Sequence, residues 1–272
     1  MQIARANNEL LLHEDGKFFR LLGVEGATTL GVAAVFGREA SIERGEPVEG
    51  IVSLQAPFPH PSQIFAVGLN YKNHAHEMNL PIPDQPMVFT KFASCVGHPN
   101  TEVVIPGETT DWEAELVIVI GKEGRNIAAT DAFDYIAGYM VGQDISERTV
   151  QMASTPAQFS MGKSFENFAP MGPWFTSKDE IADPNQLQIT CRLNGEVMQN
   201  ESTADMAFYV PTIIEFISSI CELRAGDLIF TGSPAGVGQG QVPKRFLVEG
   251  DVLTTSISGL GEIENRFVKG KS

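Results

Sequence analysis

The sequence has few cysteines and no long apolar run. Its three cysteines, Cys95, Cys191 and Cys221, lie far apart and form no Cys-x-x-Cys pair, which argues against a disulfide scaffold and favours a reducing cytoplasm. The N-terminal stretch MQIARANNELLLHEDG lacks the continuous apolar segment of a signal peptide. Every apolar run is far shorter than the ~18 residues that a membrane-spanning helix needs. We therefore expect a soluble, cytoplasmic protein with no membrane partner.

Positive charge is also scarce. The 272 residues include 19 Lys and Arg against 34 Asp and Glu, which gives a formal net charge of −15 at pH 7. Such an excess of negative charge disfavours a nucleic acid or an anionic membrane surface as partner. A cation, or a small anion held through a cation, is the expected ligand. Hydrophobic residues make up 43% of the chain, enough for a sizeable core, so a disordered chain is excluded.

The pattern of short apolar segments separated by turn residues predicts a mostly-β (α+β) fold. A hairpin is expected over 10–26, with Asp15-Gly16 in its bend. Three prolines between 57 and 61 indicate a stiff connector. We therefore divide the chain into a small N-terminal β domain, 1–60, and a larger domain, 61–272. Further strands are predicted at 64–70, 115–121, 138–144, 187–195, 227–233 and 252–261.

Two segments have helical patterns. The first is 131–137, with Thr130 as N-cap and Gly138 as its end. The second is 211–223, with Pro211 at its first position. Its apolar stripe is predicted to comprise Ile213, Ile214, Ile217, Ile220 and Cys221.

Three carboxylates stand at the ends of predicted strands. Glu113 and Glu115 alternate at the start of an apolar strand, so both side chains point to one face. Asp144 ends the next apolar run. Like charges at the mouth of a buried strand need compensation, which a hard divalent cation with oxygen ligands provides. Three carboxylates suit Mg²⁺, with Mn²⁺ or Ca²⁺ as substitutes. The alternative is a set of exposed carboxylates at strand ends.

The five histidines fit no familiar zinc site. His74-Ala75-His76 resembles the opening of a zinc amidohydrolase barrel, but no histidine follows His98 to complete it. There is no His-Glu-x-x-His, no Gly-x-Ser-x-Gly around Ser233, and no Gly-Lys-Ser/Thr closing the glycine-rich loop 232–240.

Isolated polar residues offer further candidates. His74 and Glu77 are three residues apart, so on a helical turn they form an imidazole–carboxylate pair that is suited to activating water, or a surface ion pair. Lys163 is a lone cation in an uncharged stretch; it stabilises an oxyanion or is a surface lysine. Arg148 and Gln151 follow Asp144 by four and seven residues and would face the same region.

From about Gln63 to Phe267 the sequence resembles the fumarylacetoacetate hydrolase family. Several motifs in the family's order carry the resemblance. They are Gly68-Leu-Asn-Tyr71 with His74 and Glu77, Glu113-Ala-Glu115, Gln143-Asp144-Ile-Ser-Glu-Arg148, Gly162-Lys-Ser-Phe165, Gly172-Pro173 and Asp227-Leu-Ile-Phe-Thr-Gly-Ser-Pro-Ala-Gly236.

The resemblance implies a mixed β-sandwich roll with a small N-terminal domain, usually a homodimer. It also implies roles for single residues. Glu113, Glu115 and Asp144 would be metal ligands, His74 and Glu77 a water-activating pair on a lid, and Lys163 the oxyanion lysine. Arg148, Gln151, Ser233 and Tyr71 would contact the substrate.

Two departures from the family pattern matter. Val67 stands where members that cleave fumarylacetoacetate have a further aspartate ligand, and Ser233 replaces the usual threonine. The first departure indicates the smaller branch, which includes acylpyruvases, diketo-sugar-acid hydrolases and oxaloacetate decarboxylases.

The resemblance implies Mg²⁺-dependent hydrolysis of a C–C bond in a 2,4-dioxo acid, an acylpyruvate or a 2,4-diketo-3-deoxy sugar acid. The products would be pyruvate, or a related 2-oxo acid, and a carboxylic acid. Alternatives are oxaloacetate decarboxylation, hydration or isomerisation of a 2-oxo-alkenoic acid, and a metal-dependent binding protein without activity. The segments 78–84 and 149–159, which no family motif reaches, are expected to select the substrate's side chain.

Overall fold

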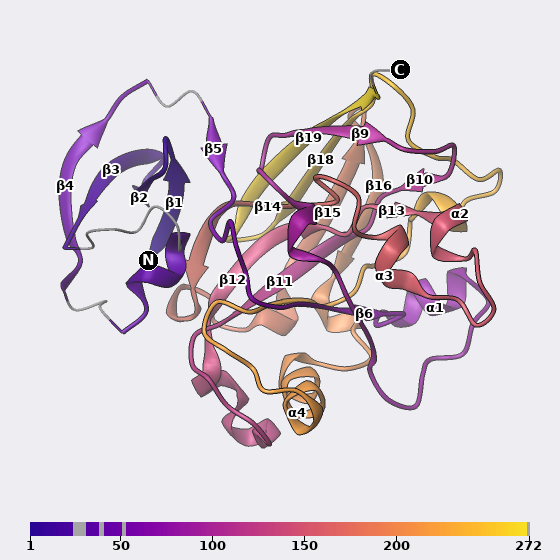
Figure 1. Cartoon of the computed structure of the whole chain (residues 1–272), viewed down its shortest axis with the longest axis horizontal. Helices are drawn as coiled ribbons and strands as arrows, with labels where there is room; N and C mark the ends of the chain where they lie inside the picture. Colours follow the sequence, from indigo (N-terminus) through magenta and orange to yellow (C-terminus); the bar gives the residue numbers. More distant parts are fainter. Residues whose placement is uncertain (24–30, 38–40, 51–52, 271–272) are drawn as a thin grey trace.

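The computed structural model describes residues 1–23, 31–37, 41–50 and 53–270. Over these residues strands predominate and the helices are short (Figure 1), so the predicted mostly-β class is confirmed. The predicted hairpin is present, since β2 (Glu9–Glu14) pairs with β3 (Lys17–Leu22) around Asp15-Gly16. Its last three predicted residues, 24–26, lie outside the described part. No described helix is long and apolar enough to cross a membrane.

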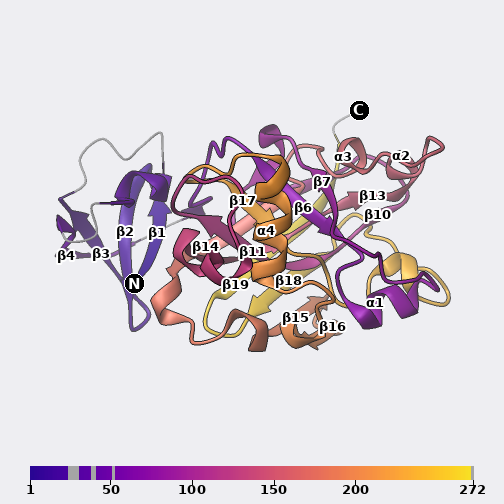
Figure 2. The same ribbon diagram turned by 90° about the horizontal axis from the view of Figure 1, so that it is seen from below.

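One large sheet runs through the N-terminal segment and the body. Its order is β4-β3-β2-β1-β14-β12-β11-β17-β6-β7, with β5 paired to β1 and β8 to β14. The remaining bounds are β1 (Gln2–Ala6), β4 (Glu43–Val48), β5 (Leu54–Gln55), β6 (Ile64–Gly68), β7 (Met87–Thr90), β8 (Val96–Gly97), β11 (Ala114–Ile120), β12 (Ile136–Gln143), β14 (Ala169–Ser177) and β17 (Leu228–Phe230). Strands β1 to β4 form a lobe at one end of the molecule (Figure 2). Because β1 pairs with β14, this lobe extends the sheet of the body. The domain boundary at residue 60 stays a prediction.

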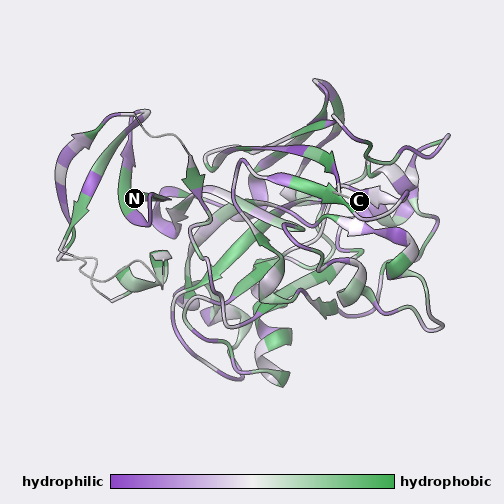
Figure 3. Cartoon of the chain, turned by 45° about the horizontal axis from the view of Figure 1, so that its top comes forward, coloured by the Kyte–Doolittle hydropathy of each residue, from purple (hydrophilic) through white to green (hydrophobic). Residues whose placement is uncertain are grey.

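A second sheet faces the first. It has the order β16-β15-β18-β19-β9. Its strands are β9 (Glu102–Ile105), β15 (Gln188–Leu193), β16 (Glu196–Ser202), β18 (Val252–Ile257) and β19 (Gly261–Lys269). Strands β11, β12 and β14 contact β15, β18 and β19, and hydrophobic segments lie along strands in the middle of the body (Figure 3). The core therefore lies between two sheets, as in the expected β-sandwich roll.

Strand β11 is an interior strand of the large sheet. Its sequence AELVIVI is rich in β-branched residues, which favour strands. It pairs with β12 on one side and β17 on the other, and every residue is buried. The predicted strand buried on both faces is confirmed. Glu115, on this strand, is therefore held in the protein interior.

The predicted helix over 131–137 is wrong. A 3₁₀ helix covers Ala129–Tyr135 instead, and its N-cap is Ala128 rather than Thr130. Ile136 already belongs to β12, where it pairs with Ile120. Strand pairing with β11 therefore overrides the local helical pattern.

The predicted helix over 211–223 is present but shorter. It is α4, Val210–Ile220, with Ile213, Ile214 and Ile217 buried. Ile220 is 62% exposed, so the predicted apolar stripe ends one turn early. Beyond the helix the chain extends, and Leu223 forms a bridge with Gly124. That bridge gives the backbone tertiary partners that a longer helix would forgo.

The remaining elements are short. A two-stranded ribbon joins β10 (Thr110–Asp111) to β13 (Ser146–Glu147). The other α-helices are α1 (Lys72–Glu77), α2 (Arg148–Gln151) and α3 (Phe159–Gly162). They lie at the end opposite the N-terminal lobe (Figure 2). The other 3₁₀ helices are Gly31–Val35, Ala93–Cys95, Lys178–Glu180, Pro184–Gln186, Thr203–Asp205 and Gly238–Gly240.

Candidate active site

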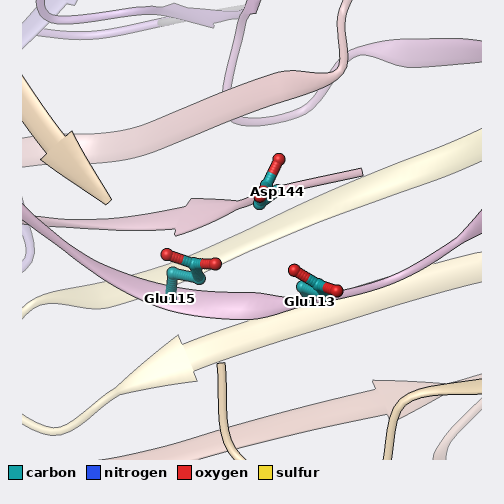
Figure 4. A group of neighbouring side chains, drawn as sticks. All are labelled: Glu113, Glu115 and Asp144. Carbon is teal, nitrogen blue, oxygen red and sulfur yellow. The ribbon is translucent and has the colours of Figure 1, made fainter. Parts of the chain in front are cut away.

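Three buried carboxylates gather where β11 begins and β12 ends. One oxygen of each of Glu113, Glu115 and Asp144 lies within 4.8 Å of the others (Figure 4). The strand register explains this arrangement. Ala114 pairs with Gln143, so Glu113 lies next to Asp144, and Glu115 points to the same face of β11 as Glu113. The Asp144 N–H donates to the Glu113 carbonyl at 2.9 Å. The predicted acidic cluster is confirmed as a geometric group, and the alternative of exposed strand-end carboxylates is wrong because all three are buried.

Cations pair with two of these carboxylates. Lys163 Nζ lies 2.6 Å from Glu113 Oε2 and 2.6 Å from Asp144 Oδ2. Arg148 Nη1 lies 2.7 Å from Glu113 Oε1. Burial alone would raise the pKa of Glu113, but Lys163 and Arg148 hold it well below its usual range. Burial likewise opposes the charge of Lys163, yet Asp144 and Glu113 raise its pKa, so Lys163 remains an ammonium.

Glu115 has no such partner. It accepts the Gly232 N–H at 2.7 Å, and no lysine or arginine in the described ranges forms an ion pair with it. Burial, together with Asp144 and Glu113, raises its pKa well above the ordinary value. The triad thus lacks positive charge at Glu115. An oxygen-only donor set with that deficit fits a hard divalent cation.

His74 and Glu77 form the predicted pair on helix α1. His74 Nδ1 lies 3.1 Å from Glu77 Oε2, and the His74 ring is buried. The other oxygen, Glu77 Oε1, accepts the Gly236 N–H at 2.9 Å. Glu77 is therefore fixed between α1 and the glycine-rich loop. With Nδ1–H directed at a carboxylate, the Nε2 lone pair of His74 is left to accept a proton.

A cavity of about 130 Å³ adjoins both groups, since His74 and Glu113 line it whereas Glu77, Glu115 and Asp144 are not among its lining residues. Its polar lining includes most of the predicted site residues. They are His74, Glu113, Arg148, Gln151, Lys163 and Ser233, together with Gln239. Val67 also lines it, so the aspartate that the resemblance places there in fumarylacetoacetate-cleaving members is replaced by an apolar wall.

A family model for the C-terminal part of fumarylacetoacetate hydrolase matches residues 63–268. The chain belongs to the fumarylacetoacetate hydrolase family. It is 43% identical over 219 residues to a Bos taurus protein named oxaloacetate tautomerase, mitochondrial; the match covers 80% of this chain and 70% of that protein.

Solved structures extend the comparison. A Mycobacterium smegmatis protein provisionally classed as HpcE has a TM-score of 0.92, 38% identity and full coverage of both chains. A maleylpyruvate hydrolase from Sphingobium, solved with manganese(II) and pyruvate, has a TM-score of 0.80 and 27% identity, again over both whole chains. The predicted family and fold are confirmed, and the named relatives are enzymes.

Of the four residues predicted to contact the substrate, Arg148, Gln151 and Ser233 line the cavity and Tyr71 does not. Ser233 Oγ accepts from Gln199 Nε2 at 2.7 Å, and Gln151 Oε1 accepts from Arg148 Nη1 at 3.0 Å. Tyr71 is fully buried and is not among the residues that line the cavity. Its hydroxyl has no hydrogen-bond partner within the described residues. The structure therefore does not bring Tyr71 to the substrate cavity.

Two residues at this site were missed by the sequence analysis. Lys91 Nζ lies 2.5 Å from Asp144 Oδ1 and also donates to the carbonyl of Lys163. The Asp111 carboxylate accepts hydrogen bonds from Arg148 Nε and Nη2 and from the backbone N–H groups of Gly238 and Gln239. Asp111 continues the alternation of Glu113 and Glu115, a signal that was available. Nothing local distinguishes Lys91 from a surface lysine.

Replacing Lys91 with methionine tests its structural role. Lys91→Met removes a buried ammonium and leaves Asp144 with Lys163 as its only cation in the described chain. Breaking one side of a buried ion pair costs roughly 3–5 kcal/mol, so we expect a clearly lower midpoint in thermal unfolding. Lys244→Met, at an exposed lysine, is the control and should unfold like the wild type. Equal midpoints for both variants would refute the assignment.

Proposed function

We propose that this chain is a divalent-cation-dependent enzyme that forms the enolate of a 2-oxo acid at C3. Its first proposed reaction is the interconversion of the keto and enol forms of oxaloacetate. The observation that carries the proposal is that one cavity is lined by the His74 imidazole, the Lys163 ammonium and Glu113, which belongs to the buried acidic triad. The relative named oxaloacetate tautomerase supports this substrate.

The protonation states of His74 and Lys163 suit two different roles in this reaction. His74 Nε2 would take a proton from C3 of the bound keto acid, with Glu77 stabilising the imidazolium that forms. Lys163 stays protonated and would donate a hydrogen bond to the oxygen on which negative charge develops. Return of the proton to that oxygen gives the enol.

Glu113, Glu115 and Asp144 are the residues that would hold the cation. A bound Mg²⁺ would act as a Lewis acid toward the carboxylate and carbonyl of the 2-oxo acid. Mn²⁺ or Ca²⁺ are alternatives, and the manganese(II) in the Sphingobium hydrolase supports a divalent ion at a site of this family.

A second candidate is hydrolysis of a C–C bond in a 2,4-dioxo acid. The same pair, His74 and Glu77, supports it, because a base that removes a proton from carbon also removes one from water. Water would attack C4, Lys163 would stabilise the alkoxide, and cleavage of C3–C4 would release a carboxylic acid and a 2-oxo acid. The maleylpyruvate hydrolase relative supports this reaction. Oxaloacetate decarboxylation, 2-oxo-alkenoate hydration or isomerisation, and binding without turnover remain further alternatives.

Removing the metal tests the proposal. We expect chelator-stripped protein to lose enzyme-dependent decay of enol oxaloacetate, followed by ultraviolet absorbance, and to recover it with Mg²⁺ or Mn²⁺. Proton NMR of acetylpyruvate in a parallel tube reports acetate and pyruvate, the products of hydrolysis. An enzyme-dependent tautomerisation rate that is unchanged by the chelator and by added metal would refute the proposal. Hydrolysis without tautomerisation would favour the second candidate.

A homodimer and a cytoplasmic location are further proposals for this chain. The family resemblance supports the dimer, and the small number of unpaired cysteines supports a reducing compartment. The bovine relative is named as mitochondrial, which does not support a cytoplasmic location.

A further inference from the structure

Gln239 lines the cavity from the glycine-rich loop 232–240, although it belongs neither to the acidic triad nor to the His74–Glu77 pair. We propose that Gln239 is a specificity-determining residue, whose side-chain amide donates a hydrogen bond to the second carboxylate of a dicarboxylic 2-oxo acid. The proposal rests on the proposed function, because oxaloacetate carries such a carboxylate at C4.

The backbone at Gln239 is held in place by the protein. Its N–H donates to Asp111 Oδ2 at 3.0 Å, and the N–H of Gly238 donates to Asp111 Oδ1 at 2.7 Å. On its other side, Gly240 lies so close to Glu77 that a Cβ there would come within 2.4 Å of the carboxyl carbon. Gln239 therefore starts from a fixed point beside the cavity, which preorganises its side chain for a ligand.

The side-chain amide of Gln239 has no hydrogen-bond partner among the residues that the structure describes. Other glutamines near the site differ in this respect. The amide of Gln199 donates to Ser233 Oγ at 2.7 Å, and that of Gln241 donates to Met198 Sδ at 3.4 Å. Gln239 is thus free to donate to a molecule in the cavity.

Arg148 is the cation that a second carboxylate would otherwise use. Its Nε and Nη2 lie 2.8 and 2.7 Å from Asp111 Oδ2, and its Nη1 lies 3.0 Å from Gln151 Oε1. All three nitrogens therefore already donate within the protein. The same contacts tie both cavity glutamines to one ion pair, since Gln151 is bonded to Arg148 and Gln239 to Asp111.

Much of the remaining lining is apolar. Its side chains are Met78, Leu80, Phe89, Met152 and Phe159. Four of these lie in the segments 78–84 and 149–159, which the sequence analysis expected to select the substrate's side chain, whereas Gln239 lies in neither. A carboxylate placed against apolar side chains loses its hydration without compensation. A single amide that donates to it should therefore have a large effect on which ligands bind.

Binding of two inert four-carbon acids tests the proposal without turnover. We would titrate the Mg²⁺-loaded full chain calorimetrically with malate and with 2-hydroxybutanoate, which have no carbonyl to enolise and differ only in the second carboxylate. In Gln239→Leu we expect the affinity for malate to fall ~10-fold or more, and the affinity for 2-hydroxybutanoate to change less than ~2-fold. Equal losses for both ligands, no loss for either, or a wild type without preference for malate would overturn the proposal.

A rescue variant and a matched control separate direct contact from a general effect. Gln239→Lys restores a donor at the same position, so we expect it to regain the preference for malate. Gln241→Leu and Gln241→Lys are the controls, because Gln241 lies two positions further along the chain and does not line the cavity. Both should keep the wild-type preference. A Gln239→Lys protein that binds malate as weakly as Gln239→Leu, or an equal shift in Gln241→Lys, would count against the contact.

Failure of this proposal and failure of the proposed function give different results. Selective loss of malate binding in Gln239→Leu, in a protein that never enolises oxaloacetate, would refute the activity and leave the contact standing. Metal-dependent tautomerisation with the same KM for oxaloacetate in Gln239→Leu and the wild type would do the reverse.

Discussion

Glu115→Gln should severely weaken binding of the divalent cation and yet stabilise the metal-free protein. The carboxylate contributes one of the three oxygens of the triad and, unlike Glu113 and Asp144, pairs with no cation in the described chain. Glutamine retains an oxygen to accept the Gly232 N–H. We expect metal affinity to fall on the order of 100-fold or more, and catalysis to be lost with it.

The stability change should depend on pH in a defined direction. The pKa of Glu115 is raised in the folded state by burial and by its carboxylate neighbours. The folded protein therefore holds a proton that the unfolded chain releases above a pH of about 4.3, and the metal-free wild type loses stability from there upward through the folded pKa. Glu115→Gln removes that loss, so its advantage should grow with pH.

Thermal unfolding between pH 5 and 8, with and without Mg²⁺, measures both effects. Mg²⁺ should raise the midpoint of the wild type and leave that of Glu115→Gln unchanged. Glu201→Gln is the matched control, since burial also raises the pKa of Glu201 although it lies outside the triad. Undiminished metal stabilisation of Glu115→Gln would refute the assignment of Glu115 as a ligand.

His74→Ala should reduce kcat by ~10²–10⁴-fold while metal affinity stays near the wild-type value. The imidazole lines the cavity and its Nδ1 faces Glu77, but it is not part of the acidic triad. Removal of the base therefore affects proton transfer rather than assembly of the cation site. Steady-state kinetics with oxaloacetate and acetylpyruvate, alongside a metal titration, separate the two.

Two further variants sharpen this test. His76→Ala lies on the same helix at an exposed position and should keep full activity. Glu77→Gln preserves an acceptor for the Gly236 N–H but loses the negative charge beside the imidazole, so we expect an intermediate kcat. Turnover of His74→Ala at the wild-type rate would rule out the imidazole as the base.

Parts of the fold and site could be predicted from local pattern. The alternation of Glu113 and Glu115 before an apolar β-branched run located both the central strand and the buried acidic cluster, because a strand has a side-chain period of two. The spacing of His74 and Glu77 located their pair, because residues three positions apart lie on the same face of a helix.

Other parts could not be predicted, since distant partners determine them. Ile136 pairs with Ile120 and so ends a segment whose local pattern is helical. Lys91 becomes a site residue only because the chain directly after β7 lies beside Asp144, 53 positions later in the chain. Tyr71 carries a family motif, yet packing places it away from the cavity.

The sequence by itself determined the family, the mostly-β class, the residues of the acidic triad and the imidazole–carboxylate pair, since each depends on residue types in local patterns or on the order of motifs along the chain. Only the tertiary structure decided how charge is distributed over the site. It brings cations to Glu113 and Asp144, withholds them from Glu115, and lines much of the cavity with apolar side chains. Those facts depend on contacts between residues remote in the chain, and burial makes such contacts energetically decisive because charge inside a protein is poorly screened.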